Sequence, residues 1–295
     1  MFKMMVSQGL LAVFLSFAAP AAADTPVPSQ ADWNAARKTV TTADGQMLSY
    51  VEMGAADGQP VLLLHGYTDN SRAWSMLAPL LTGRRLIALD LRGHGGSAAP
   101  DCCYGLDSFA HDVNAFMEVM HIDKADVVGH SLGSMTAATL AAYYPERVDQ
   151  LVLLSTATNV PKGTADWLWD NVPKLKYPID PNSEFMKAWY ANPTPVNEDF
   201  ITRERGESAA VPAQVWMGVL RALTPTDWSS ITSRITAPTL VIWGDQDPLF
   251  DAASQTRLKE LLPAAEYKTF TGLGHNFFWE QPEKAAKEIN GFLTP

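Results

Sequence analysis

The sequence has little cysteine, few histidines and no excess of positive charge. Its 295 residues include two cysteines and six histidines, and the formal net charge is −10. Two cysteines exclude a scaffold held together by many disulfides. The histidines are scattered, with no pair at the spacing of metal ligands, so we expect no metal site. An acidic chain also lacks the electrostatic attraction that nucleic-acid binding requires.

The two cysteines, Cys102 and Cys103, are neighbours in the sequence. Cα atoms joined by one trans peptide lie about 3.8 Å apart, below the usual range for a disulfide. A disulfide between them would close a strained ring, and pairing with a sulfur of another chain is a further alternative. Of these alternatives we expect two partly buried thiols.

The N-terminal segment, residues 1–23, differs in composition from the rest of the chain. Lys3 precedes a short apolar run over residues 9–17, and small residues follow as far as Ala23. This order is typical of a signal peptide, and the apolar run is too short to span a bilayer comfortably. We therefore expect cleavage after Ala23 and export to the periplasm or the medium, with an uncleaved membrane anchor as the alternative.

Short apolar runs alternate with stretches of helical periodicity along most of the chain. A hairpin with an Asp-Gly turn is expected over residues 38–52. Continuous apolar strands are typical of a parallel sheet that is covered on both faces. The sequence predicts an α/β fold, with a mostly parallel central sheet flanked by helices. The strand-like runs are 61–64, 86–89, 125–128, 151–154 and 239–243, and the helical stretches are 72–81, 108–120, 252–262, 282–292 and the segment after Ser131.

One region, residues 158–232, breaks this alternation. It has no strand-like run and is dense in tryptophan and proline, with helical pieces around residues 164–170, 183–191 and 212–223. We expect a helical cap, inserted between a first core part at residues 24–157 and a second at residues 233–295. Most of its aromatic residues are expected to form the interior of the cap, while one or two face the substrate.

The pentapeptide Gly129-His130-Ser131-Leu132-Gly133 stands between an apolar run and an alanine-rich helical stretch. A serine between glycines at a strand-to-helix joint is the nucleophile-elbow pattern. The sharp turn holds the serine in a strained conformation, and glycine is expected at 129 and 133 because a side chain there would collide with the neighbouring strand or helix. The following helix directs its free N–H groups toward the reacting centre. The pattern predicts that Ser131 is a nucleophile.

A serine hydroxyl needs a base within hydrogen-bond reach and an acid that orients the base. His275, in a glycine-flanked loop, is the only histidine after Ser131. Two carboxylates, Asp245 and Asp247, follow the run at residues 239–243. We expect Asp247 to be the acid, because Asp245 is closer to the strand end and can tie the turn by bonding its own backbone.

Several of these segments together resemble the α/β-hydrolase fold superfamily, in its serine-nucleophile branch of esterases, cofactor-free haloperoxidase-like enzymes and carbon–carbon bond hydrolases. The resemblance covers nearly all of the chain after residue 23. It implies an oxyanion hole formed by the backbone N–H groups of Tyr67 and Leu132, and a bracing rather than catalytic role for Asp90 and Arg92. The matching segments are Leu64-His65-Gly66-Tyr67, residues 90–97, the pentapeptide, residues 244–247, Gly274-His275 and Glu280-Gln281-Pro282.

These observations predict a secreted or periplasmic serine hydrolase that cleaves a carboxylic ester or a lactone through an acyl-enzyme. The catalytic residues are Ser131, Asp247 and His275, and Tyr67, Trp189 and Trp216 are expected to contact the small-molecule substrate. No cofactor or metal is expected. Carbon–carbon bond hydrolysis, aminopeptidase activity and perhydrolysis on the same residues remain alternatives, as does a ligand receptor on this fold. The sequence leaves the substrate and the oligomeric state open.

Overall fold

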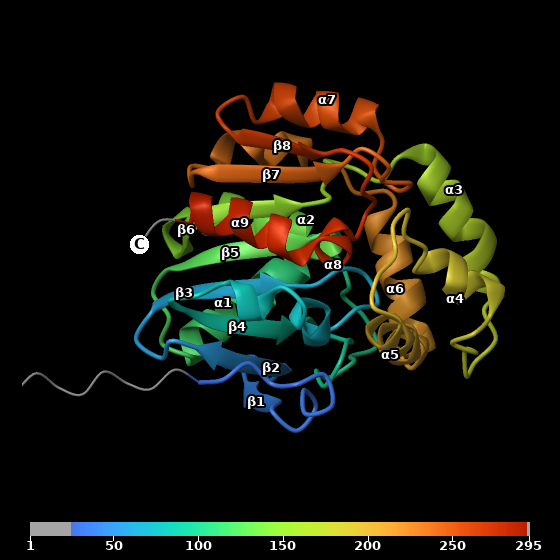
Figure 1. Ribbon diagram of the computed structural model, residues 1–295, viewed down its shortest axis with the longest axis horizontal. Coiled ribbons are helices and arrows are strands. Elements are labelled where there is room, and N and C mark those ends of the chain that lie inside the picture. The colour runs from blue at the N-terminus through green and yellow to red at the C-terminus, as the bar shows by residue number, and fades with distance from the viewer. Residues whose placement is uncertain (1–24, 294–295) are drawn as a thin grey trace, which may run out of the picture.

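The computed structural model describes residues 25–293, and a single sheet forms the centre of this part of the chain (Figure 1). Its strand order is β1-β2-β4-β3-β5-β6-β7-β8. β2 pairs antiparallel with β1 and β4, and every pair from β4 to β8 is parallel, which confirms the predicted mostly parallel sheet. The strands are β1 (Lys38–Thr41), β2 (Met47–Gly54), β3 (Gln59–Leu64), β4 (Arg84–Asp90), β5 (Ala125–His130), β6 (Val148–Leu154), β7 (Thr239–Gly244) and β8 (Glu266–Phe270).

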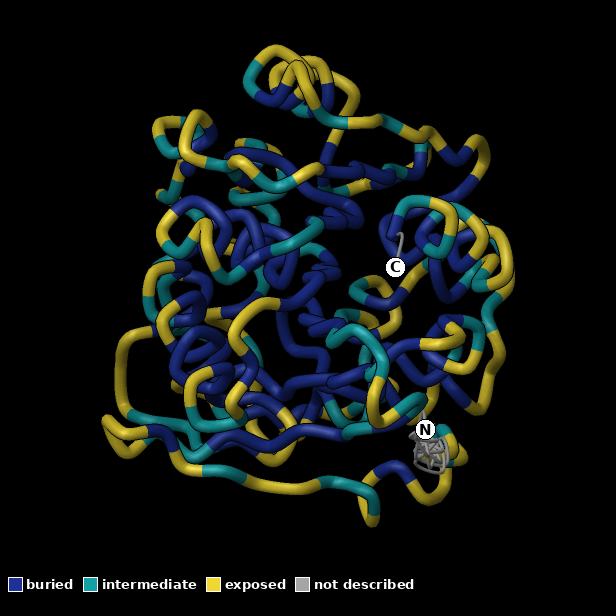
Figure 2. The backbone as a smooth tube through the Cα atoms, turned by 90° about the vertical axis from the view of Figure 1, so that its left-hand side faces the viewer, coloured by how far each residue is buried: buried dark blue, intermediate teal, exposed yellow. Residues whose placement is uncertain are grey.

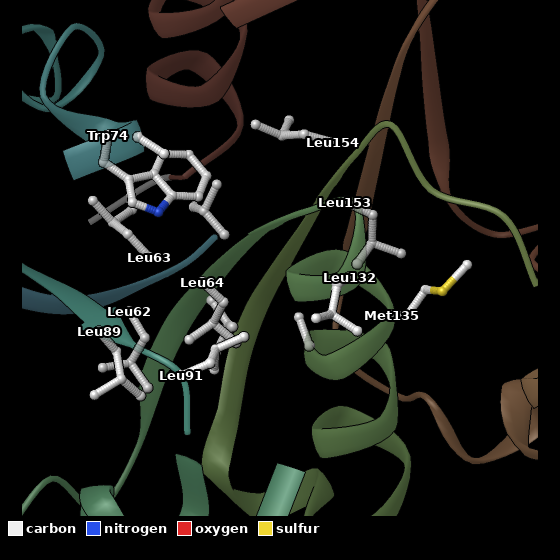
Figure 3. Close-up of a cluster of buried hydrophobic side chains, with 14 of the residues drawn as sticks. Leu62, Leu63, Leu64, Trp74, Leu89, Leu91, Leu132, Met135, Leu153 and Leu154 are labelled. Atoms are coloured by element: carbon white, nitrogen blue, oxygen red, sulfur yellow. The ribbon is translucent and has the colours of Figure 1, made fainter. Parts of the chain in front are cut away.

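The central strands are apolar along their length because helices cover both faces of the sheet. The last four residues of β3 and of β6 are all buried. Figure 2 shows the buried backbone concentrated in the interior and the exposed backbone along the outer loops. In contrast, the edge strand β8 is mostly exposed and carries polar residues. Figure 3 labels part of the buried cluster: Leu62, Leu63, Leu64, Trp74, Leu89, Leu91, Leu132, Met135, Leu153 and Leu154.

Helices lie on both faces of the sheet. α1 (Leu106–Val119) packs against α2 (Leu132–Tyr143), and Figure 1 shows α2 behind the sheet and α9 (Pro282–Phe292) in front of it. α8 (Phe277–Glu280) precedes α9, and α7 (Ala252–Leu261) lies between β7 and β8 in the chain. The predicted helices at residues 108–120, 252–262 and 282–292 are confirmed.

The prediction of a helix over residues 72–81 is wrong. The structure has two short 3-10 turns there, Ser71–Trp74 and Ala78–Leu80. The side chain of Asn70 accepts a hydrogen bond from the Arg72 N–H and caps the first turn. Pro79 lies at the start of the second turn, where it lacks an N–H group and cannot continue a preceding helix. The apolar spacing of this segment therefore reflects packing against the sheet rather than a continuous helix.

Four helices lie in the chain between β6 and β7, within the segment that we call the helical insertion (residues 158–232). They are α3 (Lys162–Asn171), α4 (Glu184–Trp189), α5 (Glu198–Ala209) and α6 (Ala213–Leu223), followed by a 3-10 helix, Trp228–Arg234. Three correspond to predicted helical pieces, whereas α5 was not predicted. Figure 1 shows these helices at the carboxyl ends of the parallel strands, where α/β folds bind their ligands.

The expectation for the cysteines is wrong. Cys102 and Cys103 form a disulfide with each other, and both residues are exposed, in the loop between β4 and α1. Cys103 has a positive φ of 73°, so the backbone adopts a conformation that brings the two neighbouring sulfurs together. The disulfide therefore forms although the two Cα atoms are only 3.8 Å apart.

The predicted signal peptide, residues 1–23, lies outside the described residues. Within residues 25–293, none of the helices combines the length and the apolar character needed to cross a membrane.

Candidate active site

Ser131 occupies a sharp turn between β5 and α2. Its φ of 52° and ψ of −118° lie in a strained region for a residue with a side chain. The structure explains the flanking glycines, because a Cβ atom at Gly129 would lie 2.3 Å from the Gly133 carbonyl oxygen. At Gly133 a Cβ atom would lie 2.1 Å from the Leu64 carbonyl oxygen. The turn therefore has the geometry expected of a nucleophile elbow.

His275 and Asp247 are joined by a hydrogen bond of 2.8 Å between Nδ1 and Oδ2. Asp247 follows β7, and its Oδ1 accepts hydrogen bonds of 2.8 Å from the Leu249 N–H and 3.1 Å from the Phe250 N–H. Because a carboxylate accepts this bond, Nδ1 of the histidine carries the proton and Nε2 keeps a lone pair. Both side chains are buried, so the imidazole is held in one tautomer and one orientation.

The second candidate acid, Asp245, has a different partner. Its Oδ1 accepts a hydrogen bond of 2.7 Å from the Gly272 N–H and joins the turn after β7 to the turn after β8. Asp245 therefore ties the loop through the backbone of the turn after β8, rather than through its own backbone as expected, while Asp247 faces the base.

Two backbone contacts hold the loop that carries His275. The His275 carbonyl oxygen accepts a hydrogen bond of 2.7 Å from the Ser155 hydroxyl, and His130 Nε2 lies 3.1 Å from the same oxygen. Sequence reasoning missed the role of Ser155. Its positive φ of 46°, immediately after β6, has no simple sequence signal.

Tyr67 and Leu132 lie at the positions that the resemblance implies for an oxyanion hole. Tyr67 is in the loop after β3, and Leu132 is the first residue of α2, where backbone N–H groups have no partner inside the helix. Within residues 25–293, neither backbone N–H donates to a protein acceptor. Of the two residues, Tyr67 lines the cavity beside Ser131, and Leu132 is not among its lining residues.

A cavity of about 360 Å³ brings Ser131 and His275 together with residues of the helical insertion. Among the described side chains, the His275 ring is hydrogen-bonded to Asp247. Ser131 and His275 line the same cavity but form no direct hydrogen bond with each other. Such contacts often tighten only when substrate is bound. The residues that line the cavity are Gly66, Tyr67, Asp69, His130, Ser131, Gly163, Thr164, Trp167, Ala188, Trp189, Tyr190, Ala191, Pro248, Leu249, His275, Asn276 and Trp279.

Of the three predicted substrate contacts, Tyr67 and Trp189 line this cavity and Trp216 does not. Trp216 is 0% exposed and lies behind the wall, with its ring centroid 5.2 Å from that of Tyr67 and 6.1 Å from that of Trp189. Its carbonyl oxygen accepts a hydrogen bond from the Tyr67 hydroxyl. Trp216 therefore supports the wall, because α6 buries its apolar face.

The other histidines near the site are neutral structural groups. Burial lowers the pKa of His94 to about 4 and lowers the pKa values of His65 and His130 well below their usual range. His65 Nε2 accepts a hydrogen bond of 2.9 Å from the Leu91 N–H, which joins the loops after β3 and β4. The contacts of these histidines therefore give them a structural role.

Asp90 and Arg92 brace the loop after β4. Asp90 accepts hydrogen bonds of 2.7 Å from the Ser71 N–H and 2.9 Å from the Gly96 N–H. The guanidinium group of Arg92 makes two hydrogen bonds to the Asp112 carboxylate on α1. Neither Asp90 nor Arg92 lines the cavity, in agreement with the bracing role that the resemblance implies.

Comparison with known proteins assigns the family. The family model described as alpha/beta hydrolase fold matches residues 59–282. A non-heme chloroperoxidase of Streptomyces lividans is 30% identical over 274 residues, which cover 86% of this chain and 99% of that protein. Lipase 3 of a Moraxella species is 27% identical, and the match covers 86% of this chain and 84% of that protein. The solved structure of a hydrolase from Pseudomonas aeruginosa PA01 is 25% identical, has a TM-score of 0.77 and covers 88% of this chain and 98% of that one.

The fold, the family model and these relatives lead to one class: this chain belongs to the α/β-hydrolase fold family, and it is a hydrolase of that family.

Proposed function

We propose that this protein is a serine hydrolase that cleaves a carboxylic ester or a lactone through an acyl-enzyme. The observation that carries the proposal is the Asp247–His275 hydrogen bond of 2.8 Å beside a cavity that also contains Ser131 at a strained turn. Esterases and lipases among the similar proteins support ester chemistry.

In the proposed first half-reaction, Ser131 Oγ attacks the carbonyl carbon of the substrate, and its proton moves to His275 Nε2. The negative charge that develops on the carbonyl oxygen is stabilised by the N–H groups of Tyr67 and Leu132. Each such donor typically lowers the barrier by about 3 kcal/mol. The carbon–oxygen bond to the alcohol then breaks, the leaving oxygen takes the proton from Nε2, and an acyl group remains on Ser131.

In the second half-reaction, water attacks the acyl group and gives its proton to Nε2. The tetrahedral intermediate collapses, the proton returns to Ser131 Oγ and the carboxylic acid leaves. Throughout both halves Asp247 holds the imidazole in the required tautomer and stabilises the positive charge that forms on it.

The helical insertion is proposed to act as a cap between core parts at residues 24–157 and 233–295. Trp167 and Trp189 line the cavity from the insertion. Large rigid rings provide apolar contact area at a small cost in conformational entropy. The proposed division of labour assigns the reaction to the core and substrate preference to the cap.

Export is a separate proposal. Residues 1–23 have the composition of a signal peptide, and the mature protein would begin at Asp24. Mass spectrometry of the protein recovered from an exporting host tests this proposal, and retention of residues 1–23 would contradict it.

The test of activity is steady-state turnover of a panel of p-nitrophenyl esters of increasing acyl length and of lactones. Wild-type protein is expected to release many equivalents of product, whereas a ligand receptor would release one equivalent or none. Ser131→Ala should lower kcat by several orders of magnitude, because only the oxyanion donors and substrate binding remain. Full activity of this variant, with folding verified by circular dichroism, would contradict the proposal.

A further inference from the structure

The cavity wall combines aromatic rings with one carboxyl group. Within the described part of the chain, neither lysine nor arginine lines it, and Asp69 supplies its only carboxyl group. Aromatic faces attract cations through their quadrupole, and a carboxylate adds a full negative charge. The aromatic residues of the lining are Tyr67, Trp167, Trp189, Tyr190 and Trp279.

Asp69 lies in the loop after β3 and is 5% exposed. The Tyr190 hydroxyl donates a hydrogen bond of 2.7 Å to its Oδ1, and Oδ2 lies 3.9 Å from His130 Nδ1. Burial raises the pKa of this carboxyl group to about 6, against a lowering by the Tyr190 hydrogen bond. At neutral pH Asp69 is therefore an anion that has been removed from water.

The groups around Asp69 do not neutralise this charge. His130 Nε2 lies 3.1 Å from the His275 carbonyl oxygen, which only accepts, so Nε2 carries the proton and Nδ1 is left as an acceptor. Burial lowers the pKa of His130, which keeps the ring neutral.

Glu204 of α5, which interacts electrostatically with Asp69, is 0% exposed, and its carboxyl oxygens have no hydrogen-bond partner in the described chain. Burial raises its pKa well above the usual range, which favours the uncharged form of this carboxyl group. Arg72, which approaches from the same loop, is paired with Glu207 at 2.7 Å. Within the described chain, no lysine or arginine forms an ion pair with Asp69.

The position of this anion matters for the reaction. A Cβ atom built on Gly66 would lie 2.8 Å from Asp69 Oδ2, and Gly66 directly precedes Tyr67, a proposed oxyanion donor. An anion close to the oxygen that becomes negative would oppose the formation of the tetrahedral intermediate. A positive charge on the substrate would offset both this repulsion and the cost of burying the carboxylate.

We propose that the cavity selects esters that carry an ammonium group, held between the Asp69 carboxylate and the aromatic rings of the wall. This inference rests on the proposed ester hydrolase activity and adds the substrate class. The cation belongs to the acyl or the alcohol part of the ester and lies on the Asp69 side of the scissile carbonyl. A neutral ester of the same shape has the aromatic contacts but leaves the carboxylate without a partner.

The test compares two isosteric substrates, the acetate ester of choline and the acetate ester of 3,3-dimethylbutanol, in which carbon replaces nitrogen. Wild-type protein should have the higher kcat/KM for the choline ester. In Asp69→Asn, the ratio of the two kcat/KM values should fall by about tenfold or more, because the charge partner of the cation is removed. Asp166→Asn, at an exposed residue of α3, removes the same charge and should leave the ratio unchanged.

A second measurement uses wild-type protein alone, so it does not depend on the folding of a variant. Choline should inhibit the hydrolysis of p-nitrophenyl acetate competitively and more strongly than 3,3-dimethylbutanol. Equal inhibition, or equal ratios in wild type and Asp69→Asn, would overturn the cation inference while ester hydrolysis stands. Absence of turnover by wild-type protein on every ester, p-nitrophenyl acetate included, would instead contradict the proposed function itself.

Discussion

The half of the cavity supplied by the sheet is held differently from the half supplied by the helical insertion. In the sheet half, Ser131 and Asp247 follow the ends of β5 and β7, and His275 lies after β8. Backbone hydrogen bonds fix Asp247 and the His275 loop. In the insertion half, stacking of side chains holds the wall, and the rings of Trp167 and Trp189 lie 6.0 Å apart at 8°.

This difference indicates which part of the site tolerates sequence variation. A group that must meet a reacting atom within a fraction of an ångström is placed by strand ends, which packing on both sides keeps rigid. A wall of stacked rings can change shape with little effect on the strand ends, so substrate preference can change while the reaction is retained. The hydrogen bonds that join the halves include those of Trp189 Nε1 to Thr68 Oγ1 at 3.0 Å and of the Tyr190 hydroxyl to Asp69 at 2.7 Å.

The largest expected effect comes from the sheet half. Asp247→Asn should lower kcat by about 10⁴-fold, because an amide favours the wrong tautomer of His275. Asp245→Asn, the matched control, should have a much smaller effect, because its carboxyl group bonds the Gly272 N–H rather than the base. Steady-state kinetics of both variants on one ester measure the difference, and a reversed order would show that the acid has been assigned incorrectly.

The two tryptophans separate the wall from its support. Trp216→Ala should lower the free energy of unfolding by about 3–5 kcal/mol, because it removes a fully buried ring. Trp189→Ala, at a partly exposed cavity residue, should change the relative rates across the ester panel with a smaller loss of stability. Thermal unfolding and substrate profiles decide. Unchanged relative rates for Trp189→Ala, with a large drop in melting temperature, would assign this ring to structure alone.

Asp69 is one of the residues that join the halves. Burial raises the folded-state pKa of Asp69 from 3.8 to about 6, so ionisation of its carboxyl group costs stability. The cost is absent near pH 4, grows as the pH rises between these two values and is complete above pH ~6. Asp69→Asn should therefore be more stable than wild type at pH 8, by on the order of 2–3 kcal/mol, with the difference vanishing near pH 4. Chemical denaturation at both pH values measures this, and a variant that is less stable at pH 8 would contradict the assigned burial cost.

The smallest effect is expected in the helical insertion. Gly206 lies inside α5, and a Cβ atom there would meet nothing within 4 Å. Gly206→Ala should raise the free energy of unfolding by about 0.5–1 kcal/mol and leave the kinetics unchanged. A loss of stability would show that α5 is more tightly packed than its surroundings indicate.

The sheet half could be predicted from the sequence because its signals are local. The glycines around Ser131 are required by collisions within the elbow, and His275 is the only histidine that follows the serine. The order of apolar runs predicted the parallel strands. The catalytic roles of these residues stay predictions, although the Asp247–His275 hydrogen bond agrees with them.

The insertion half could not be predicted to the same extent. α5 was missed because its inward face includes the polar residues Glu204 and Ser208, which weaken the apolar periodicity. Asp69 was missed because its importance arises only when Tyr190, 121 residues later in the chain, comes into contact with it. Trp216 was assigned to the cavity because composition cannot tell which side of a helix a ring faces. The disulfide between Cys102 and Cys103 occurs with a positive φ at Cys103, a backbone conformation that the sequence does not indicate.

In the proposed reaction Ser131 becomes acylated, with His275 as its base. This step is tested most directly by mass spectrometry of the protein after treatment with a fluorophosphonate that modifies activated serines. The account predicts one adduct per chain, located by peptide mapping on Ser131, absent in Ser131→Ala and formed far more slowly in Asp247→Asn. An adduct on another residue of wild-type protein, or ester hydrolysis that continues undiminished after Ser131 is fully modified, would contradict it.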